Sequence, residues 1–267
     1  MAWKSKSTTD GEIDTHKCLF VGHHGWGKTT QAIHLQKAYG PGLIISGEGG
    51  LRSVMTEEID YVDFTSWDGE HKPDEGKYSF RGICRDMASA EFQKAGYTWI
   101  MIDSLTELAD QCMAHVSEVH KDNKNGFEKW GDYGRMMLGA VKWVRDLPFH
   151  VVVTSLAKEE DDDNGQTHYW PMLQGRGVMK QLPGIFDHVF CGIRVTSGDR
   201  ENPMVTRYVV TDEVRGWHGK ARDPRPRLKP VEKTGNITDL FRAMSMSDEE
   251  FKKQQTKIQP TRTEDNE

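Results

Sequence analysis

The sequence at residues 18–30 is CLFVGHHGWGKTT, a short apolar run followed by a glycine-rich turn that ends in lysine and threonine. The turn fits the phosphate-binding pattern G-x-x-x-x-G-K-[ST]. The predicted nucleotide-binding residues are Gly22, His23, His24, Gly25, Trp26, Gly27, Lys28, Thr29 and Thr30. Glycines let successive backbone N–H groups point at an anion, and the lysine adds a charge for the β- and γ-phosphates. A helix predicted from Lys28 to Tyr39 directs the positive end of its dipole to the same place, so the stretch predicts a site for ATP.

A magnesium site is predicted from Thr29 and Asp103. The Thr29 hydroxyl belongs to the motif position that ligates Mg²⁺. Asp103 ends the apolar run Trp99–Ile102, which is typical of a central parallel strand buried on both faces. Asp103 could instead cap the following helix, but Ser104 and Glu107 already form a capping box there. The carboxylate of Asp103 is therefore expected to hold the metal through water.

Strand and helix signals alternate along the rest of the chain. Apolar runs predict strands at 43–45 and 150–155, and helices are predicted from Leu105 to Val119 and around Met137 to Val144. Residues 189–194 and 204–210 predict a late antiparallel pair, and Asp163-Asn164-Gly165 predicts a hairpin turn. The pattern indicates an α/β fold, a P-loop NTPase core with a mostly parallel central sheet flanked by helices and late antiparallel strands.

Length and composition suit one such domain. The chain has 267 residues, of which 36% are hydrophobic, and a net charge of −6. We expect a flexible arm at 1–14, an ATPase core at 15–233, and a short C-terminal helix with a disordered tail at 234–267, because few apolar residues follow Ser245. No apolar stretch approaches the roughly 18 residues of a spanning helix, and the N-terminus lacks a secretory signal, which predicts a cytoplasmic protein without membrane contact.

Three motifs in order resemble the RecA-like recombinases, and particularly the compact bacteriophage members associated with recombination and single-strand annealing. They are the phosphate loop, the strand Leu43-Ile44-Ile45 followed by Glu48, and Ile100-Met101-Ile102-Asp103-Ser104. The resemblance runs from about Thr15 to Arg222. It implies that Glu48 polarises the attacking water and that the polar end of the strand 151–155 senses the γ-phosphate. That end is Thr154-Ser155 rather than the asparagine–glutamine pair of bacterial RecA, and Ser155 is taken as the nucleotide contact.

Chemistry alone also favours Glu48. In-line attack of water on a γ-phosphate needs an acceptor that orients the water. A glutamate among glycines at the carboxyl end of a strand lies on the ligand side of an open α/β sheet. The alternative is a loop glutamate that pairs with Arg52.

The segment Gly219-Lys220-Ala221-Arg222 resembles the late K-x-[KR] element of the same family. The resemblance implies that Lys220 and Arg222 reach the nucleotide of a neighbouring subunit across a ring or filament interface. A cation delivered in this way neutralises charge in the transition state. Binding to DNA and a solvated basic loop are the alternatives, since the segment from Val214 to Lys233 is rich in basic residues.

Single-stranded DNA is the predicted partner, together with self-association. The resemblance places DNA-contacting loops at about Val119–Arg135 and Lys158–Lys180, and the first mixes lysines with aromatic rings, as suits single strands. The second contains an acidic block, Glu159–Asp163, which repels phosphate. A nucleotide-dependent regulator without DNA and a small-molecule kinase remain alternatives. A GTPase is disfavoured because Asn123-Lys124-Asn125-Gly126 lacks the aspartate of the base-reading motif.

Overall fold

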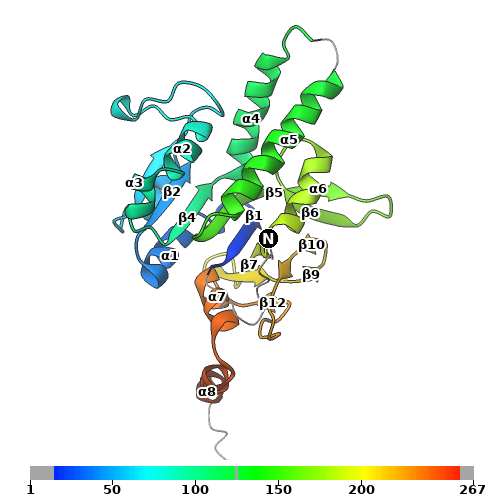
Figure 1. Ribbon diagram of the computed structural model, residues 1–267. Helices are drawn as coiled ribbons and strands as arrows, with labels where there is room; N and C mark the ends of the chain where they lie inside the picture. The colour runs from blue at the N-terminus through cyan, green and yellow to red at the C-terminus, as the bar shows by residue number, and fades with distance from the viewer. Residues whose placement is uncertain (1–14, 124–125, 259–267) are drawn as a thin grey trace, which may run out of the picture.

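The protein is built on one large twisted sheet (Figure 1). The computed structural model describes residues 15–123 and 126–258. Six strands run parallel in the order β7-β1-β5-β4-β2-β3. Their bounds are β1 Lys17–Gly22, β2 Gly42–Ser46, β3 Asp60–Asp63, β4 Trp99–Asp103, β5 His150–Asp161 and β7 His188–Ser197. The predicted α/β class with a mostly parallel central sheet is confirmed.

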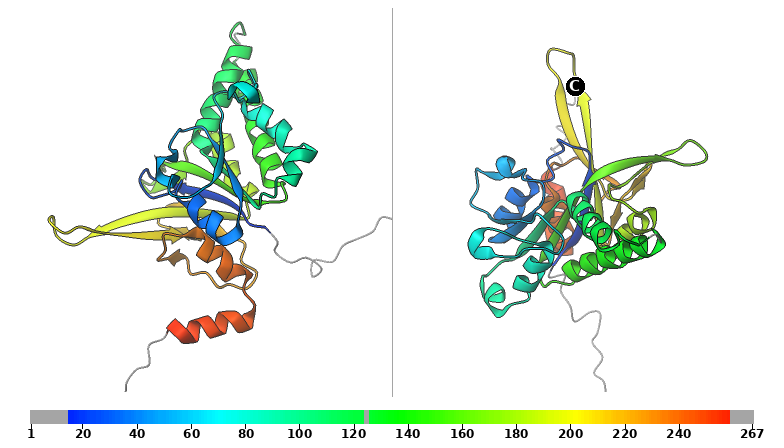
Figure 2. Two further views of the ribbon diagram at one scale, coloured as in Figure 1. Left: turned by 90° about the vertical axis from the view of Figure 1, so that its left-hand side faces the viewer. Right: turned by 90° about the horizontal axis from the view of Figure 1, so that it is seen from above.

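Antiparallel strands complete the sheet and extend from it. β8 (Met204–Val210) pairs antiparallel with β7, and β6 (Thr167–Pro171) pairs antiparallel with the outer half of β5. Four short strands follow: β9 Glu213–Val214, β10 Trp217–His218, β11 Lys220–Ala221 and β12 Val231–Glu232. The β5–β6 and β7–β8 hairpins project beyond the body of the domain (Figure 2). The predicted late antiparallel pair and the hairpin turn at Asp163–Gly165 are both confirmed.

Helices cover both faces of the sheet, as buried strands require. One face carries α2 Phe80–Met87, α3 Ala90–Lys94, α4 Leu105–Val119, α5 Gly126–Arg145 and α6 Arg176–Ile185. The other face carries α1 Gln31–Tyr39 and α7 Ile237–Ser245, which pack on Phe20, Trp99 and Phe190. Two short 3₁₀ helices, Leu51–Val54 and Pro73–Glu75, flank β3. The antiparallel pair α4 and α5 extends past the sheet as an arm (Figure 1).

The first helix after the phosphate loop begins later than predicted. α1 starts at Gln31 rather than Lys28, and the amides of Gln31, Ala32 and Ile33 each bond a carbonyl three residues earlier. The chain therefore enters the helix through tight 3₁₀-type turns. The Gln31 side chain, which is buried, spans this entry by donating to the carbonyls of Gly27 and Gly235.

The C-terminal segment is more ordered than its composition predicted. α8 spans Asp248–Ile258, so the predicted disorder is wrong for these residues. Ser247 and Glu250 form a reciprocal capping box that satisfies two backbone N–H groups at its start. Arg227 pairs with Asp248 at 2.6 Å and lies over the Phe251 ring. Residues 1–14 and 259–267, the predicted arm and the end of the tail, lie outside the described residues. No helix in the described part of the chain has the length and apolarity needed to cross a bilayer.

Three histidines cluster at the amino-terminal edge of the parallel strands, where His16 and His188 are buried and His150 is half-buried. His16 Nδ1 shares a hydrogen bond of 3.2 Å with His188 Nε2, and the His16 backbone N–H donates to His150 Nδ1 at 3.1 Å. The His16 ring stacks on Phe241 of α7 at 4.4 Å. Burial, followed by the charges of His188 and His150, lowers the pKa of His16 from 6.5 to about 3.

Stability is expected to fall on acidification because of this cluster. Unfolding restores the ordinary pKa of His16, so below pH 6.5 the unfolded chain binds more protons and is favoured. His16 alone accounts for a loss of about 2 kcal/mol between pH 7 and pH 5. Urea unfolding at both pH values measures the loss, and His16→Phe is expected to reduce it. His24→Phe, which replaces an exposed histidine, is the control and should leave the pH dependence unchanged. Equal pH dependence in all three proteins would contradict the prediction.

Candidate functional site

The predicted site residues meet at the carboxyl edge of the parallel strands. Gly22 ends β1, and the register of β2 and β4 places Ser46 beside Asp103. Thr154 lies opposite Phe20 in the β1–β5 pair. Because the strands are parallel and in register, the residues that follow them converge on one edge of the sheet.

The conformation of the phosphate loop depends on its own glycines and on a buried tryptophan. Gly25 and Gly27 have φ values of +72° and +102°, a region that favours glycine. Trp26 is 1% exposed, and its indole N–H donates to the Ile193 carbonyl at 3.0 Å. Its ring lies over Gly192, where an added Cβ would come within 2.8 Å of it. The loop is therefore anchored to β7.

Lys28, Thr29 and Asp103 form a compact polar group beneath the loop. The Thr29 hydroxyl donates to Asp103 Oδ2 at 2.7 Å, and the Thr154 hydroxyl donates to Asp103 Oδ1 at 2.5 Å. The Lys28 ammonium donates to the carbonyls of Gly22 and His23. Burial lowers the pKa of Lys28, and the carboxylates of Glu48 and Asp103 oppose this shift. A cation, a hydroxyl and a buried carboxylate thus lie where the phosphate chain would enter.

The donor set fits magnesium. Asp103 is 2% exposed and both of its carboxylate oxygens accept from hydroxyl groups, one of which is the Thr29 hydroxyl. Hard oxygen donors of this kind, completed by water and phosphate oxygens, suit Mg²⁺. The separate prediction that Ser104 caps the next helix holds, because the Ser104 hydroxyl accepts from the Glu107 N–H. Asp103 is thereby free of a capping role.

Glu48 lies at the same edge, just beyond β2. Its carboxylate accepts a hydrogen bond from the Ser104 hydroxyl, the residue next to Asp103. The side chain is exposed, as an acceptor for incoming water must be. An ion pair with Arg52, the alternative considered above, is not formed within the described residues. Glu107 approaches the same loop, but its carboxylate accepts from Gln111 on α4 at 2.8 Å.

The hydroxyl groups of Ser155 and its neighbour Thr154 have different hydrogen-bond partners. The Ser155 side chain is buried, donates to the Leu156 carbonyl and accepts from the Met172 N–H. Successive strand residues point to opposite faces, which explains why Thr154, and not Ser155, bonds Asp103. The geometry therefore favours Thr154 as the polar end nearest the metal ligands.

Lys220 and Arg222 are not brought to the phosphate loop of their own chain. Lys220 pairs with Val189, which lies opposite Leu19 of β1, and Arg222 bonds Asp187, the residue before β7. At about 3.3 Å per residue, Lys220 is roughly 10 Å from the level of Gly22 along the strand and Arg222 lies farther away. The Lys220 ammonium donates to the carbonyls of Pro183 and Phe186, at the end of α6. These contacts favour a structural role within the subunit.

Two other arginines contact the phosphate loop. Arg207 Nε donates to the Trp26 carbonyl at 2.7 Å, and Arg194 donates to the Gly25 carbonyl at 3.2 Å. They form one cross-strand pair of the β7–β8 hairpin. The only signal in the sequence is that Arg194 ends the apolar run of β7, as Asp103 ends that of β4. That Arg194 lies beside the phosphate loop could not be predicted without the strand order.

His23 connects the loop to a group of aromatic side chains. Its ring lies edge-on to both Tyr169 and Trp217, and its Nε2 is 3.8 Å from Glu159. Together with His24, Trp26 and Arg194, these rings border a cavity of about 300 Å³. The His23 side chain thus faces the β5–β6 hairpin.

Comparison with protein-family models gives a match to the family described as AAA domain, over residues 14–222. The matched segment covers most of the chain, from just before β1 to just beyond β11. A search of curated proteins finds no match.

Proposed function

The chain belongs to the AAA domain family, a family of P-loop ATPases that bind and hydrolyse nucleoside triphosphate, and from this premise we propose that it couples ATP hydrolysis to binding of single-stranded DNA. The proposed setting is phage-type recombination, repair or strand annealing, with assembly of subunits into a ring or filament. The resemblance to compact RecA-like ATPases supports this setting. A regulator that binds nucleotide without DNA is the competing function.

Hydrolysis requires the chain to bind the phosphates, to hold magnesium and to orient the attacking water. Backbone N–H groups of Gly25 to Thr29 are proposed to hold the phosphates, with Lys28 as the cation that follows charge onto the γ-phosphate. Thr29 and Asp103 would hold Mg²⁺, which neutralises phosphate charge when bound. Glu48 would accept a hydrogen bond from the attacking water and orient it for in-line displacement of the γ-phosphate.

The observation that carries the DNA proposal is the tip of the α4–α5 arm. Phe127 is 89% exposed and Trp130 is 46% exposed, at the start of α5. The Lys129 ammonium lies over the Trp130 ring, 5.7 Å from its centre. Exposed rings mixed with lysine suit stacked bases and a backbone of phosphates. Lys124, part of the same predicted segment, lies outside the described residues.

The second predicted DNA segment supports the proposal less. Tyr169 stacks on Trp217 at 4.1 Å, and Trp170 stacks on His218 at 3.8 Å. Rings that are already stacked within the protein are not platforms for bases. The acidic residues of the same hairpin also oppose phosphate. DNA contact is therefore proposed through the α4–α5 arm alone.

The arm has a direct connection to the catalytic edge. Ser104 caps α4 with the same hydroxyl that donates to Glu48. A shift of α4 on DNA binding would move Ser104 and release or restrain Glu48. This connection supports stimulation of hydrolysis by DNA rather than passive binding.

Replacing both Phe127 and Trp130 with alanine is expected to leave basal ATPase unchanged and to reduce stimulation by oligothymidylate at least about tenfold, because base stacking contributes ~1–3 kcal/mol per base. Steady-state hydrolysis with and without oligothymidylate measures both quantities. Tyr61→Ala is the control, since Tyr61 is also exposed (58%) but lies on the edge strand β3. If the wild-type protein hydrolyses ATP at the same rate with and without oligothymidylate, the result would favour the regulator that binds nucleotide without DNA.

A further inference from the structure

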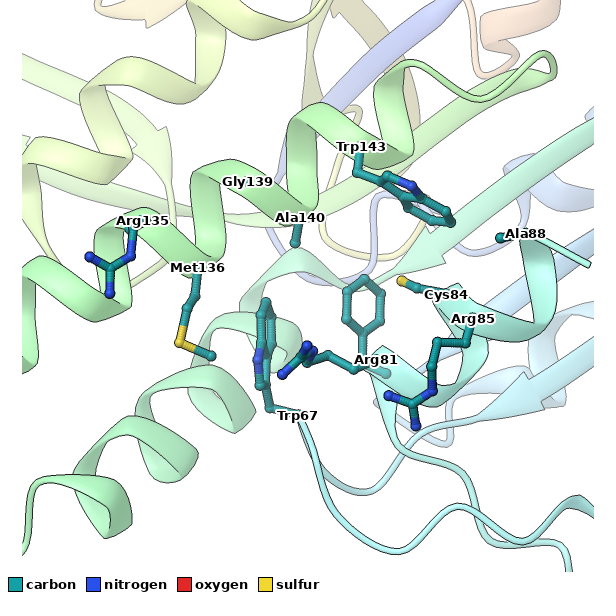
Figure 3. A pocket seen from close by; sticks show the side chains of 11 residues that line it. Trp67, Arg81, Cys84, Arg85, Ala88, Arg135, Met136, Gly139, Ala140 and Trp143 are labelled. Atoms are coloured by element: carbon teal, nitrogen blue, oxygen red, sulfur yellow. The ribbon is translucent and has the colours of Figure 1, made fainter.

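A groove unrelated to the phosphate loop lies between α2 and α5 (Figure 3). Its volume is about 610 Å³. The residues from α5 recur at three- and four-residue steps, which places them on one helix face, and those from α2 do the same. This α2–α5 groove is lined by Trp67, Phe80, Arg81, Cys84, Arg85, Ala88, Arg135, Met136, Gly139, Ala140 and Trp143.

The floor of the groove contains a buried polar group without a partner. Trp67 is 3% exposed, and its indole N–H has no hydrogen-bond partner within the described part of the chain. Figure 3 shows its ring between Met136 and the side chain of Arg81. A buried N–H left unpaired costs free energy. The Trp67 nitrogen is itself closed to solvent, so the ring provides a largely apolar floor for the groove.

The rim of the groove adds positive charge. Arg81, Arg85 and Arg135 are exposed and border it from both helices. Among the described residues that line the groove, none is acidic. Guanidinium groups pair with carboxylates in bidentate geometry. The rim thus complements an anion, while Phe80, Met136, Ala140 and Trp143 offer an apolar surface.

We propose that the α2–α5 groove binds an acidic segment of a partner protein that places a bulky apolar side chain beside its carboxylates. The apolar side chain occupies the space left open by Gly139 and Ala140. The carboxylates of the segment pair with the arginines of the rim. This inference goes beyond ATP hydrolysis and DNA binding and depends on neither.

A peptide fits the groove better than a nucleic acid does. The two aromatic rings at its floor, Trp67 and Phe80, are 3% and 1% exposed, so neither presents a free face to a base. Arg81 and Arg135 are paired with Asp68 and Asp132 at 2.6 and 2.7 Å. Among the described residues Arg85 has no ion-pair partner, so the rim offers one uncompensated cation, which suits one or two acidic side chains rather than an extended phosphate backbone.

Gly139 supplies a direct test. It is exposed in the middle of α5, and an added Cβ would meet nothing within 4 Å. Position 139 therefore accommodates a Cβ, and Gly139→Leu places an apolar side chain at the groove and improves helix propensity. Gly131→Leu is the matched control, because Gly131 is also exposed on α5 with nothing within 4 Å, yet does not line the groove. Arg85→Glu reverses one rim charge without changing the backbone.

The probe is a fluorescein-labelled peptide of two glutamates followed by leucine and phenylalanine, titrated with the full chain in fluorescence polarisation. Two further peptides replace the glutamates with glutamines or the apolar pair with glycines. We expect the first peptide to bind most tightly, and Gly139→Leu and Arg85→Glu to weaken its binding at least about tenfold, the loss of one charge-assisted contact or more. Gly131→Leu should bind as wild type does, and all variants should keep basal ATPase.

Equal affinity of the peptide for Gly139→Leu and wild type would overturn the proposal. It would also be overturned if oligothymidylate displaced the peptide and itself bound less tightly to Gly139→Leu, because the groove would then be a nucleic-acid site. Lost peptide binding in Gly131→Leu as well as in Gly139→Leu would trace the effect to α5 as a whole and would equally reject the groove.

Discussion

Lys28→Ala is expected to reduce ATP hydrolysis by at least about 10²- to 10³-fold, the range found when a cation or donor that stabilises transition-state charge is removed. Lys28 is the one motif residue whose charge can follow the γ-phosphate. Burial already lowers its pKa, with Glu48 and Asp103 opposing the shift. The ammonium is therefore held in a partly dehydrated place, where its interaction with phosphate is stronger than in water.

The fold should survive this change. The Lys28 ammonium donates only to the carbonyls of Gly22 and His23 within the described residues. The loop itself is held by Trp26, whose contacts with β7 do not involve Lys28. We expect a melting temperature close to that of wild type and a loss of nucleotide binding in equilibrium titration.

Lys37→Ala is the matched control on the same helix. Lys37 is exposed and pairs with Glu57 at 2.6 Å on the far side of α1. Surface pairs of this kind contribute little, so both hydrolysis and stability should be unchanged. Wild-type turnover in Lys28→Ala would remove the phosphate loop from the mechanism.

Glu48→Gln is expected to slow hydrolysis by about 10²- to 10⁴-fold while leaving ATP and Mg²⁺ binding intact. The substitution keeps the size of the side chain and an oxygen that can accept from Ser104, but it removes the negative charge that orients water. Because the ATP-bound state is then long-lived, any assembly that ATP stabilises should also persist longer. Single-turnover hydrolysis and nucleotide titration separate the two effects.

Glu107→Gln is the control for Glu48. Glu107 lies against the same loop, where an added Cβ on Gly47 would come within 2.6 Å of its Cγ. Its carboxylate, however, is bonded to Gln111 within α4. We expect near wild-type hydrolysis from this variant. If Glu107→Gln lost activity and Glu48→Gln kept it, the water-orienting role would pass to Glu107.

The sequence by itself determined the class of fold and the parts of the site that follow strands. A phosphate loop after a buried strand, Asp103 after another and Glu48 after a third are local patterns, each readable within a few residues. Parallel strands carry such residues to one edge, so their approach followed without knowledge of contacts. The Ser104–Glu107 cap was likewise local, and the structure contains it.

Tertiary structure alone decided which other side chains reach that edge. Arg194 and Arg207 contact the loop because β7 lies next to β1 and pairs with β8 in a register that the sequence does not specify. The same strand order carries Lys220 toward the opposite edge, where its ammonium binds the end of α6. Trp26, a variable position of the motif, became an anchor only because Gly192 leaves room for its ring. Strand order and register depend on how the faces of the sheet pack against the helices. That packing involves residues far apart in the sequence, so no short stretch of sequence specifies it.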